Sequence, residues 1–166
     1  PRATYEIPYA IIERSTGEET LEEGAKFEAC AQRWVDVSAD GWGVSLLNNP
    51  KYGHDIKGNL MRITLLRGPT APDPDCDMGR HRFSISLCPH KGDWRDAQTV
   101  RLGYEFNYPM LCLLQASHSG RYPAQMSLLQ VEPQNIALSA VKKAEDSGEL
   151  VLRWHETDGK RTTAII

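Results

Sequence analysis

The sequence lacks the short motifs that mark many common catalytic and metal-binding sites. Its 166 residues contain no G-x-S-x-G, no H-E-x-x-H and no glycine loop of the phosphate-binding type. Its cysteines form no C-x-x-C pair. The longest apolar runs are only a few residues, far below the ~20 that a membrane span needs. These absences argue against serine hydrolases of the elbow type, zincins, P-loop proteins and membrane-spanning proteins.

Neither sign of charge is in large excess. The net charge of -3 argues against strong attraction to nucleic acid or to an anionic membrane. No asparagine lies in an N-x-[ST] acceptor. The widely spaced cysteines favour reduced thiols in an intracellular protein and so a cytoplasmic location, with two disulfides or a zinc site as alternatives. They are Cys30, Cys76, Cys88 and Cys112.

Apolar and polar residues alternate with a period of two along much of the chain. The clearest cases lie within 83–87, 136–140 and 150–154, where one face of each strand meets a core. Further strands are predicted over Tyr5–Arg14, Phe27–Val37, Trp42–Leu47, Asn59–Leu66 and Met126–Glu132. Pro8 cannot donate a ladder hydrogen bond, so the first of these is expected at a sheet edge. Short strands bounded by Gly, Pro and Asn predict an antiparallel β-sandwich.

One segment departs from this pattern. Asp93 can cap a short helix over 94–106, which Tyr108-Pro109 would stop, so one helix is expected near residues 93–107. The glutamate-rich stretch Gly17–Gly24 and the aperiodic stretch Gln115–Ala124 predict exposed loops.

Three groups of residues could carry chemistry. His54-Asp55 has the composition of an acid–base dyad, but neighbours in a strand face opposite ways, which favours a turn flank instead. Cys88 and His90 could share a metal, although Pro89 between them disturbs regular geometry and no partner cluster has the usual spacing.

The third group is Asp73, Asp75 and Asp77, which resembles the start of a calcium loop. Its glycine is one place late, and the twelfth position holds Ser84 rather than a bidentate glutamate. An acidic surface turn is the better interpretation. Glycoside cleavage needs two positioned carboxyl groups, and no pair in this sequence is marked as buried and adjacent, so we expect no catalytic residue and no metal ligand in this chain.

Several short sequence segments next to predicted turns are distinctive enough to suggest a family. The chain is similar to the C-terminal β-sandwich region of glycoside hydrolase family 38, the class II α-mannosidases, nearest to the cytosolic branch. The matching blocks are Leu46-Leu47-Asn48, Lys51-Tyr52-Gly53, Leu65-Leu66-Arg67, Pro89-His90-Lys91-Gly92 and Ser139-Ala140-Val141-Lys142.

This resemblance implies a mostly β antiparallel fold of the super-sandwich type. It also implies a parent enzyme that is a retaining, metal-dependent exo-α-mannosidase acting on terminal α-mannosides. The nucleophile and a divalent metal, zinc or cobalt-like, would belong to an N-terminal catalytic α/β domain of the same polypeptide. The isolated chain would be inactive and hold no cofactor, while packing on that domain and helping to form the cleft for a mannose-containing oligosaccharide.

Two residues are implied at the sugar. The family strand that matches here ends in arginine, often doubled, but Gly68 takes the second place and leaves Arg67 alone in that role. A guanidinium fork suits vicinal hydroxyls or a carboxylate. Tyr52 offers a stacking face and a hydroxyl. The structural alternatives are an ion pair near the acidic turn for Arg67 and an edge-capping aromatic for Tyr52.

Two other functions stay open at this point: a free-standing carbohydrate-binding or interaction β-sandwich, and an assembly module that forms a homo-oligomer. The scattered tryptophans do not form the flat row that a free-standing carbohydrate binder would favour. The apolar, β-branched end Thr162–Ile166 could be a docked terminal strand. We expect instead that residues 1–166 form one domain cut from the C-terminal part of a larger α-mannosidase.

Overall fold

The computed structural model describes residues 2–17 and 20–166. These residues group into two compact units, which divide between Pro109 and Met110. The sequence predicted one domain over 1–166, whereas the contacts separate two units beside the aperiodic stretch Gln115–Ala124.

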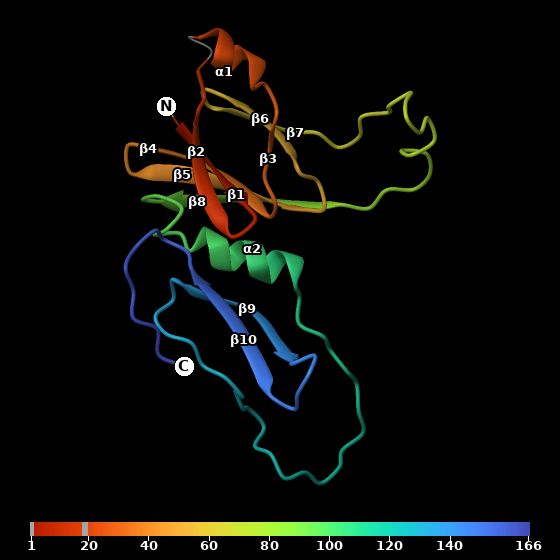
Figure 1. The fold of residues 1–166 in the computed structure, drawn as a ribbon, viewed down its shortest axis with the longest axis vertical. Coiled ribbons are helices and arrows are strands. Elements are labelled where there is room, and N and C mark those ends of the chain that lie inside the picture. The colour runs from red at the N-terminus through yellow and green to blue at the C-terminus, as the bar shows by residue number, and fades with distance from the viewer. Residues whose placement is uncertain (1, 18–19) are drawn as a thin grey trace. The chain divides into compact units, whose positions relative to one another are not determined.

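The first unit contains two antiparallel sheets (Figure 1). The larger has the order β2-β1-β4-β5-β8, and the smaller has the order β3-β6-β7. The strands of the larger sheet are β1 Arg2–Ile7, β2 Ala10–Ser15, β4 Trp34–Ala39, β5 Trp42–Asn49 and β8 Ser84–Lys91. Those of the smaller sheet are β3 Ala29–Cys30, β6 Gly53–Lys57 and β7 Leu60–Ile63.

An apolar core lies between these two sheets. Tyr5, Val35 and Leu46 contribute from the larger sheet, and Ala29 and Ile56 contribute from the smaller one. Because side chains alternate along a strand, neighbours of these residues must face the other side of the larger sheet. The prediction of a mostly β, antiparallel fold is therefore confirmed, with two packed sheets in this unit.

The helix α2, Thr99–Asn107, covers the opposite face of the larger sheet. Trp34 and Leu47, the neighbours of Val35 and Leu46, pack there with Trp94 and Val100. The rings of Trp34 and Trp94 lie 5.4 Å apart at 34°. A Cβ on Gly103 would lie 2.9 Å from Trp34 Cδ1, so the missing side chain allows this close approach.

The helix begins later than the sequence predicted. Asp93 does not cap it: its carboxylate accepts hydrogen bonds from Arg95 N at 2.7 Å and Asp96 N at 3.3 Å, which closes a local turn. Gln98, with φ of 54°, adopts the left-handed conformation and separates this turn from the helix that starts at Thr99. The expected helix near 93–107 thus has its first turn replaced by non-helical turns.

A second helix, α1 Leu21–Ala25, was not predicted. Thr20 Oγ1 accepts from Glu23 N at 3.1 Å, and Glu23 Oε2 accepts from Thr20 N at 3.2 Å. This is a capping box, readable in the sequence as T-L-E-E. The interpretation of Gly17–Gly24 as a loop was wrong for its last residues, while Glu18 and Glu19 lie outside the described residues.

Several strand boundaries also differ from the prediction. Tyr5–Arg14 is a hairpin of β1 and β2, with Pro8 in the turn rather than in an edge strand. The stretch Phe27–Val37 is interrupted between β3 and β4. Met126–Glu132 forms no strand and contributes only an antiparallel bridge from Glu132 to Ile165. The first turn holds Pro8 and Tyr9, and the interruption before β4 falls at Ala31–Arg33.

The second unit is built around one hairpin. Strands β9 Ile136–Lys143 and β10 Leu150–Glu156 pair antiparallel, with an irregularity between Arg153 and Trp154. Gln115–Ala124 forms no regular structure and is exposed, as predicted. Asn135 and Glu156 hold the end of the hairpin through a polar cluster described below.

The four cysteines are all free, as predicted. Cys30, Cys76 and Cys112 are exposed, whereas Cys88 is half-buried beside Leu47 and Trp94. We expect three thiols of the native chain to react rapidly with an aromatic disulfide reagent and the fourth to react slowly. Titration in denaturant without reductant checks the total, which should be four. A total of zero or two would contradict free thiols.

In the described ranges, 2–17 and 20–166, no helix has the length and apolar character to span a bilayer.

Candidate functional site

A shallow groove of about 650 Å³ lies along one end of the smaller sheet of the first unit. It brings together the two residues that the resemblance implied, Tyr52 and Arg67. The acidic turn supplies Cys76 and Asp77. The full lining is Phe27, Glu28, Ala29, Cys30, Pro50, Lys51, Tyr52, Gly53, Thr64, Leu65, Leu66, Arg67, Pro69, Cys76 and Asp77.

Tyr52 is placed by a turn that is tied to the core. Asn48 is fully buried, and its Nδ2 donates to the carbonyl oxygens of Gln32, at 2.7 Å, and of Lys51. The carbonyl of Tyr52 accepts from Ala31 N at 2.9 Å. With its backbone fixed, Tyr52 leaves about half of its side chain exposed at the groove. This arrangement presents an aromatic face and a hydroxyl at the groove.

Arg67 follows β7, and hydrogen bonds of its backbone fix its position. Its N–H and that of Gly68 donate to Asp77 Oδ2 at 3.0 and 2.7 Å. Gly68 has φ of 56°, a conformation that favours glycine over the second arginine common in the family. The hydrogen bonds from Gly68 and Arg67 hold the pKa of the Asp77 carboxyl below its ordinary value.

The guanidinium of Arg67 does not pair with the acidic turn. Its Nη1 lies 3.3 Å from Glu28 Oε2, while its side chain is 72% exposed. The ion pair of Arg67 is thus with Glu28, while Asp77 of the acidic turn binds only its backbone N–H. Whether Arg67 and Tyr52 bind sugar stays a prediction.

His54 and Asp55 lie in strand β6, so their interpretation as a turn flank was wrong. They face opposite sides, as expected for strand neighbours: His54 is fully buried, and Asp55 pairs with Arg62 Nε at 2.8 Å. His54 Nδ1 donates to the Tyr52 carbonyl at 3.0 Å, and Nε2 is buried with no hydrogen-bond partner. The two residues form no dyad.

Burial of the imidazole lowers the pKa of His54, opposed in part by the hydrogen bond to Tyr52 and the charge of Glu28. The unfolded chain therefore binds this proton at a higher pH than the folded chain does. The contribution to stability is complete above about pH 6.5 and is lost as the pH falls through the folded-state pKa.

We expect His54→Asn to flatten the fall in unfolding free energy below pH 6.5, because asparagine keeps a donor near the Nδ1 position and does not titrate. The change in slope is at most about 1.4 kcal/mol per pH unit. Urea unfolding at several pH values measures it, with the exposed His118→Asn as control. An unchanged slope would exclude His54 as the titrating group.

His90, the candidate partner of Cys88 at a metal, contacts a carboxylate instead. Both lie in β8, which continues through Pro89 opposite Val44, so the expectation that Pro89 breaks the geometry was wrong. His90 Nε2 lies 2.7 Å from Oδ2 of Asp36, a residue that is 1% exposed. Among residues 2–17 and 20–166, no three His, Cys, Asp or Glu side chains gather in a way that could hold a metal ion.

Asp36 is the centre of a buried polar network that the sequence analysis missed. Ser45 Oγ donates to Asp36 Oδ2 at 2.7 Å and lies 2.7 Å from Thr99 Oγ1 in α2. Ser38 Oγ also donates to the Asp36 carboxylate. This network joins three strands to the start of α2. Its sequence signal is an acidic residue inside the apolar run W-V-D-V.

The acidic turn is stabilised by hydrogen bonds within the turn. Asp73 Oδ1 accepts from Asp75 N at 3.0 Å, and Asp75 O accepts from Met78 N at 2.9 Å. Together with the bonds of Asp77, these contacts match the interpretation of an acidic surface turn.

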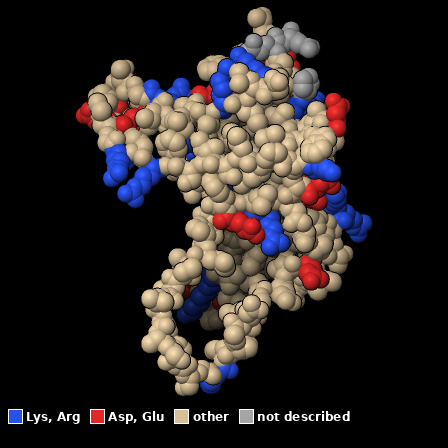
Figure 2. All heavy atoms as spheres, turned by 180° about the vertical axis from the view of Figure 1, so that it is seen from behind, with Lys and Arg blue, Asp and Glu red and all other residues tan. Residues whose placement is uncertain are grey.

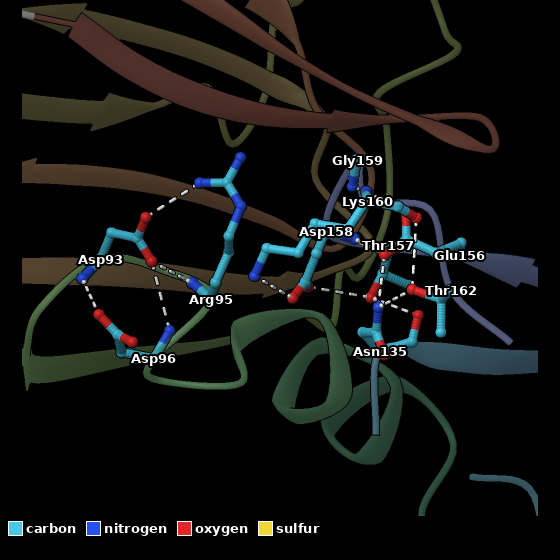
Figure 3. A network of polar contacts seen from close by, with 10 residues as sticks. All are labelled: Asp93, Arg95, Asp96, Asn135, Glu156, Thr157, Asp158, Gly159, Lys160 and Thr162. Atoms are coloured by element: carbon cyan, nitrogen blue, oxygen red, sulfur yellow. Dashed lines mark hydrogen bonds and ion pairs between the residues drawn. The ribbon is translucent and has the colours of Figure 1, made fainter. Parts of the chain in front are cut away.

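Two further polar clusters are local (Figure 3). In the first unit, Arg95 Nη1 pairs with Asp93 Oδ2 at 2.9 Å. In the second unit, Glu156 accepts from the backbone N–H groups of Asp158, Gly159 and Lys160 at 2.8–3.0 Å. Although partial burial acts to raise the pKa of Glu156, these donors and Asn135 hold it below its ordinary value. Each cluster fixes a turn.

Comparison with known proteins identifies the family of the chain. The family model "Glycosyl hydrolases family 38 C-terminal domain" matches residues 1–75, and "Glycosyl hydrolases family 38 C-terminal beta sandwich domain" matches residues 135–166. Alpha-mannosidase 2C1 of Homo sapiens is 41% identical over 162 residues, which are 95% of this chain. The chain belongs to glycosyl hydrolase family 38.

Other relatives agree with this assignment to family 38. The Alpha-mannosidase G of Dictyostelium discoideum is 34% identical over 97% of this chain, and an alpha-mannosidase of Saccharomyces cerevisiae is 40% identical over 87% of it. This chain spans only 15%, 15% and 13% of the human, Dictyostelium and yeast relatives. It therefore corresponds to a C-terminal portion of much longer family 38 proteins.

A solved structure agrees on the fold. The crystal structure of an alpha-mannosidase from Enterococcus faecalis V583 superimposes with a TM-score of 0.79, covering 94% of this chain and 19% of that chain. At 20% identity, this likeness supports the family 38 fold.

Proposed function

We propose that this chain is the C-terminal β part of a retaining, metal-dependent exo-α-mannosidase that hydrolyses terminal α-mannosides. The observation that carries the proposal is the groove where Tyr52 and Arg67 converge, in a chain about 40% identical to proteins named α-mannosidase. In this proposal the groove forms one side of the cleft for a mannose-containing oligosaccharide.

The groove supplies recognition rather than bond cleavage. A guanidinium presents planar donors that match vicinal hydroxyl groups, and an aromatic ring stacks on the apolar face of a sugar. Glycosidic cleavage needs two positioned carboxyl groups, and the groove carboxylates Glu28 and Asp77 already bind Arg67. We place the acid and the nucleophile in the catalytic α/β domain of the same polypeptide.

The divalent metal, zinc or cobalt-like, belongs to that catalytic domain in our proposal. The described residues offer no cluster of ligands that fits it. When bound there, such an ion supplies electrostatic stabilisation of the reacting sugar. The residues of this chain contribute by orienting the sugar and by excluding water from one wall of the cleft.

Exposed apolar side chains of the first unit favour contact with the rest of the polypeptide. Trp42 and Leu87 lie on β5 and β8 and are 61% and 63% exposed. On the face shown in Figure 2, lysines and arginines are interspersed with acidic residues, which fits a protein partner better than a polyanion. The free thiols are compatible with a cytoplasmic enzyme.

The test compares the full-length enzyme with the isolated 166-residue chain on an aryl α-mannoside. We expect hydrolysis by the full-length enzyme, and neither hydrolysis nor binding of a catalytic metal by the chain at any pH. Metal-dependent hydrolysis by the chain alone would overturn the assignment. A free-standing carbohydrate-binding module, the second candidate, would instead bind mannosides as the isolated chain without any catalytic partner.

A further inference from the structure

Glu28 is the one acidic side chain of the groove that contacts the Arg67 guanidinium. It directly precedes β3, and its side chain is 20% exposed compared with 72% for Arg67. Its Oε2 lies 3.3 Å from Arg67 Nη1. In the described part of the chain, no other carboxylate pairs with this guanidinium. Glu28 therefore orients the guanidinium of Arg67, whose side chain is otherwise exposed.

Gly53 makes room for the Glu28 carboxylate. A Cβ at position 53 would lie 2.0 Å from Glu28 Oε1 and 3.1 Å from Glu28 Cδ. Gly53 has no left-handed φ, so its requirement is steric. The third neighbour, Thr64 Cβ, would lie at 3.3 Å, a tight contact that needs only a small shift. The two closest atoms belong to a flexible side chain, so an alanine at position 53 would mainly push the carboxylate aside. Gly53 lies in the Lys51-Tyr52-Gly53 block that also presents Tyr52.

Arg67 is thus fixed at two points. Asp77 binds its backbone N–H at 3.0 Å, and Glu28 binds the tip of its side chain. An exposed arginine on its own samples many rotamers, and ordering them on binding costs conformational entropy. A carboxylate that already holds one edge of the fork reduces this cost and leaves the remaining donors for a ligand.

We propose that Glu28 is a positioning residue for sugar recognition, with Gly53 as the space that it needs. Glu28 holds the Arg67 fork over the groove, where its remaining N–H groups meet the vicinal hydroxyls of a terminal α-mannoside. The role rests on the proposed function, because it requires a sugar in the groove. It assigns to the Glu28–Arg67 contact a function in binding rather than in stability.

The test uses steady-state kinetics of the full-length enzyme on an aryl α-mannoside, with a melting curve for each variant. We expect Glu28→Ala and Gly53→Ala each to raise KM about tenfold, the effect of losing one ordered charged contact. kcat should change much less, and the melting temperature should stay near that of the wild type. Adding Glu28→Ala to Arg67→Ala should raise KM no further, because Glu28 acts through Arg67.

Glu13→Gln is the matched control. It removes an exposed ion pair of similar length, Glu13 Oε2 to Arg2 Nη1 at 3.4 Å, and should leave KM unchanged. If Arg67→Ala raises KM while Glu28→Ala does not, the positioning role is wrong and the proposed function stands. If the full-length wild type hydrolyses no α-mannoside, the proposed function fails and this inference fails with it. Additive effects of Glu28→Ala and Arg67→Ala would also overturn the inference.

Discussion

Asp36→Ala is expected to lower the free energy of unfolding by about 3–5 kcal/mol, the usual cost of removing one partner from a buried charged group. The carboxylate accepts from His90, Ser38 and Ser45 and is 1% exposed. Alanine removes the shared acceptor of these three donors, of which Ser45 is fully buried and the His90 side chain is 9% exposed. It also cuts the connection through Ser45 to Thr99, where α2 begins.

Urea unfolding followed by tryptophan fluorescence measures this loss, since Trp34 and Trp94 are buried beside the network. Asp75→Ala is the control, because the Asp75 side chain is exposed and should cost less than about 0.5 kcal/mol. Asp36→Asn keeps one acceptor oxygen and is expected to fall between the two. A loss below about 1 kcal/mol for Asp36→Ala would show that the network contributes little.

Arg67→Ala in the full-length enzyme is expected to lower kcat/KM by about 5- to 150-fold, equivalent to 1–3 kcal/mol for an unmade charged hydrogen bond. Arg67→Lys should restore little of this, because an ammonium group lacks the planar fork that matches two hydroxyls. The guanidinium is exposed and makes one contact at 3.3 Å, so stability should hardly change.

Kinetics on an aryl α-mannoside, combined with a melting curve, separate binding from folding for both variants. Arg62→Ala is a suitable control, because Arg62 belongs to β7 and pairs with Asp55 outside the groove lining. An unchanged kcat/KM in Arg67→Ala would show that Arg67 has a structural role and does not bind the sugar.

The fold class could be predicted because alternation is strict where a strand has one apolar face. The hairpin around 136–154 follows this pattern, whereas in 42–47 the adjacent Leu46 and Leu47 pack into the two different cores of the first unit. The helix start could not be placed, because Asp93 serves equally well as a helix cap and as the acceptor of a local turn. Only the left-handed Gln98 decides between them, and no sequence rule marks that glutamine.

The candidate site was predictable only in part. Tyr52 and Arg67 stood out through the family resemblance, and the structure places both on one groove. Glu28 did not, because its contact with Arg67 joins residues 39 positions apart. Asp36 could have been suspected, since an unpaired carboxylate in an apolar strand is costly, but its partners come from β4, β5 and β8 and could not be named from local spacing.

The two hydrogen bonds from the backbone of Arg67 and Gly68 to Asp77 bear on how the sequence of this loop can vary within the family. The segment between Gly68 and Asp77 begins and ends at the same point in space, so insertions or deletions within it need not move the arginine. We therefore expect that proline, cysteine and acidic residues within the segment can be exchanged without moving Arg67.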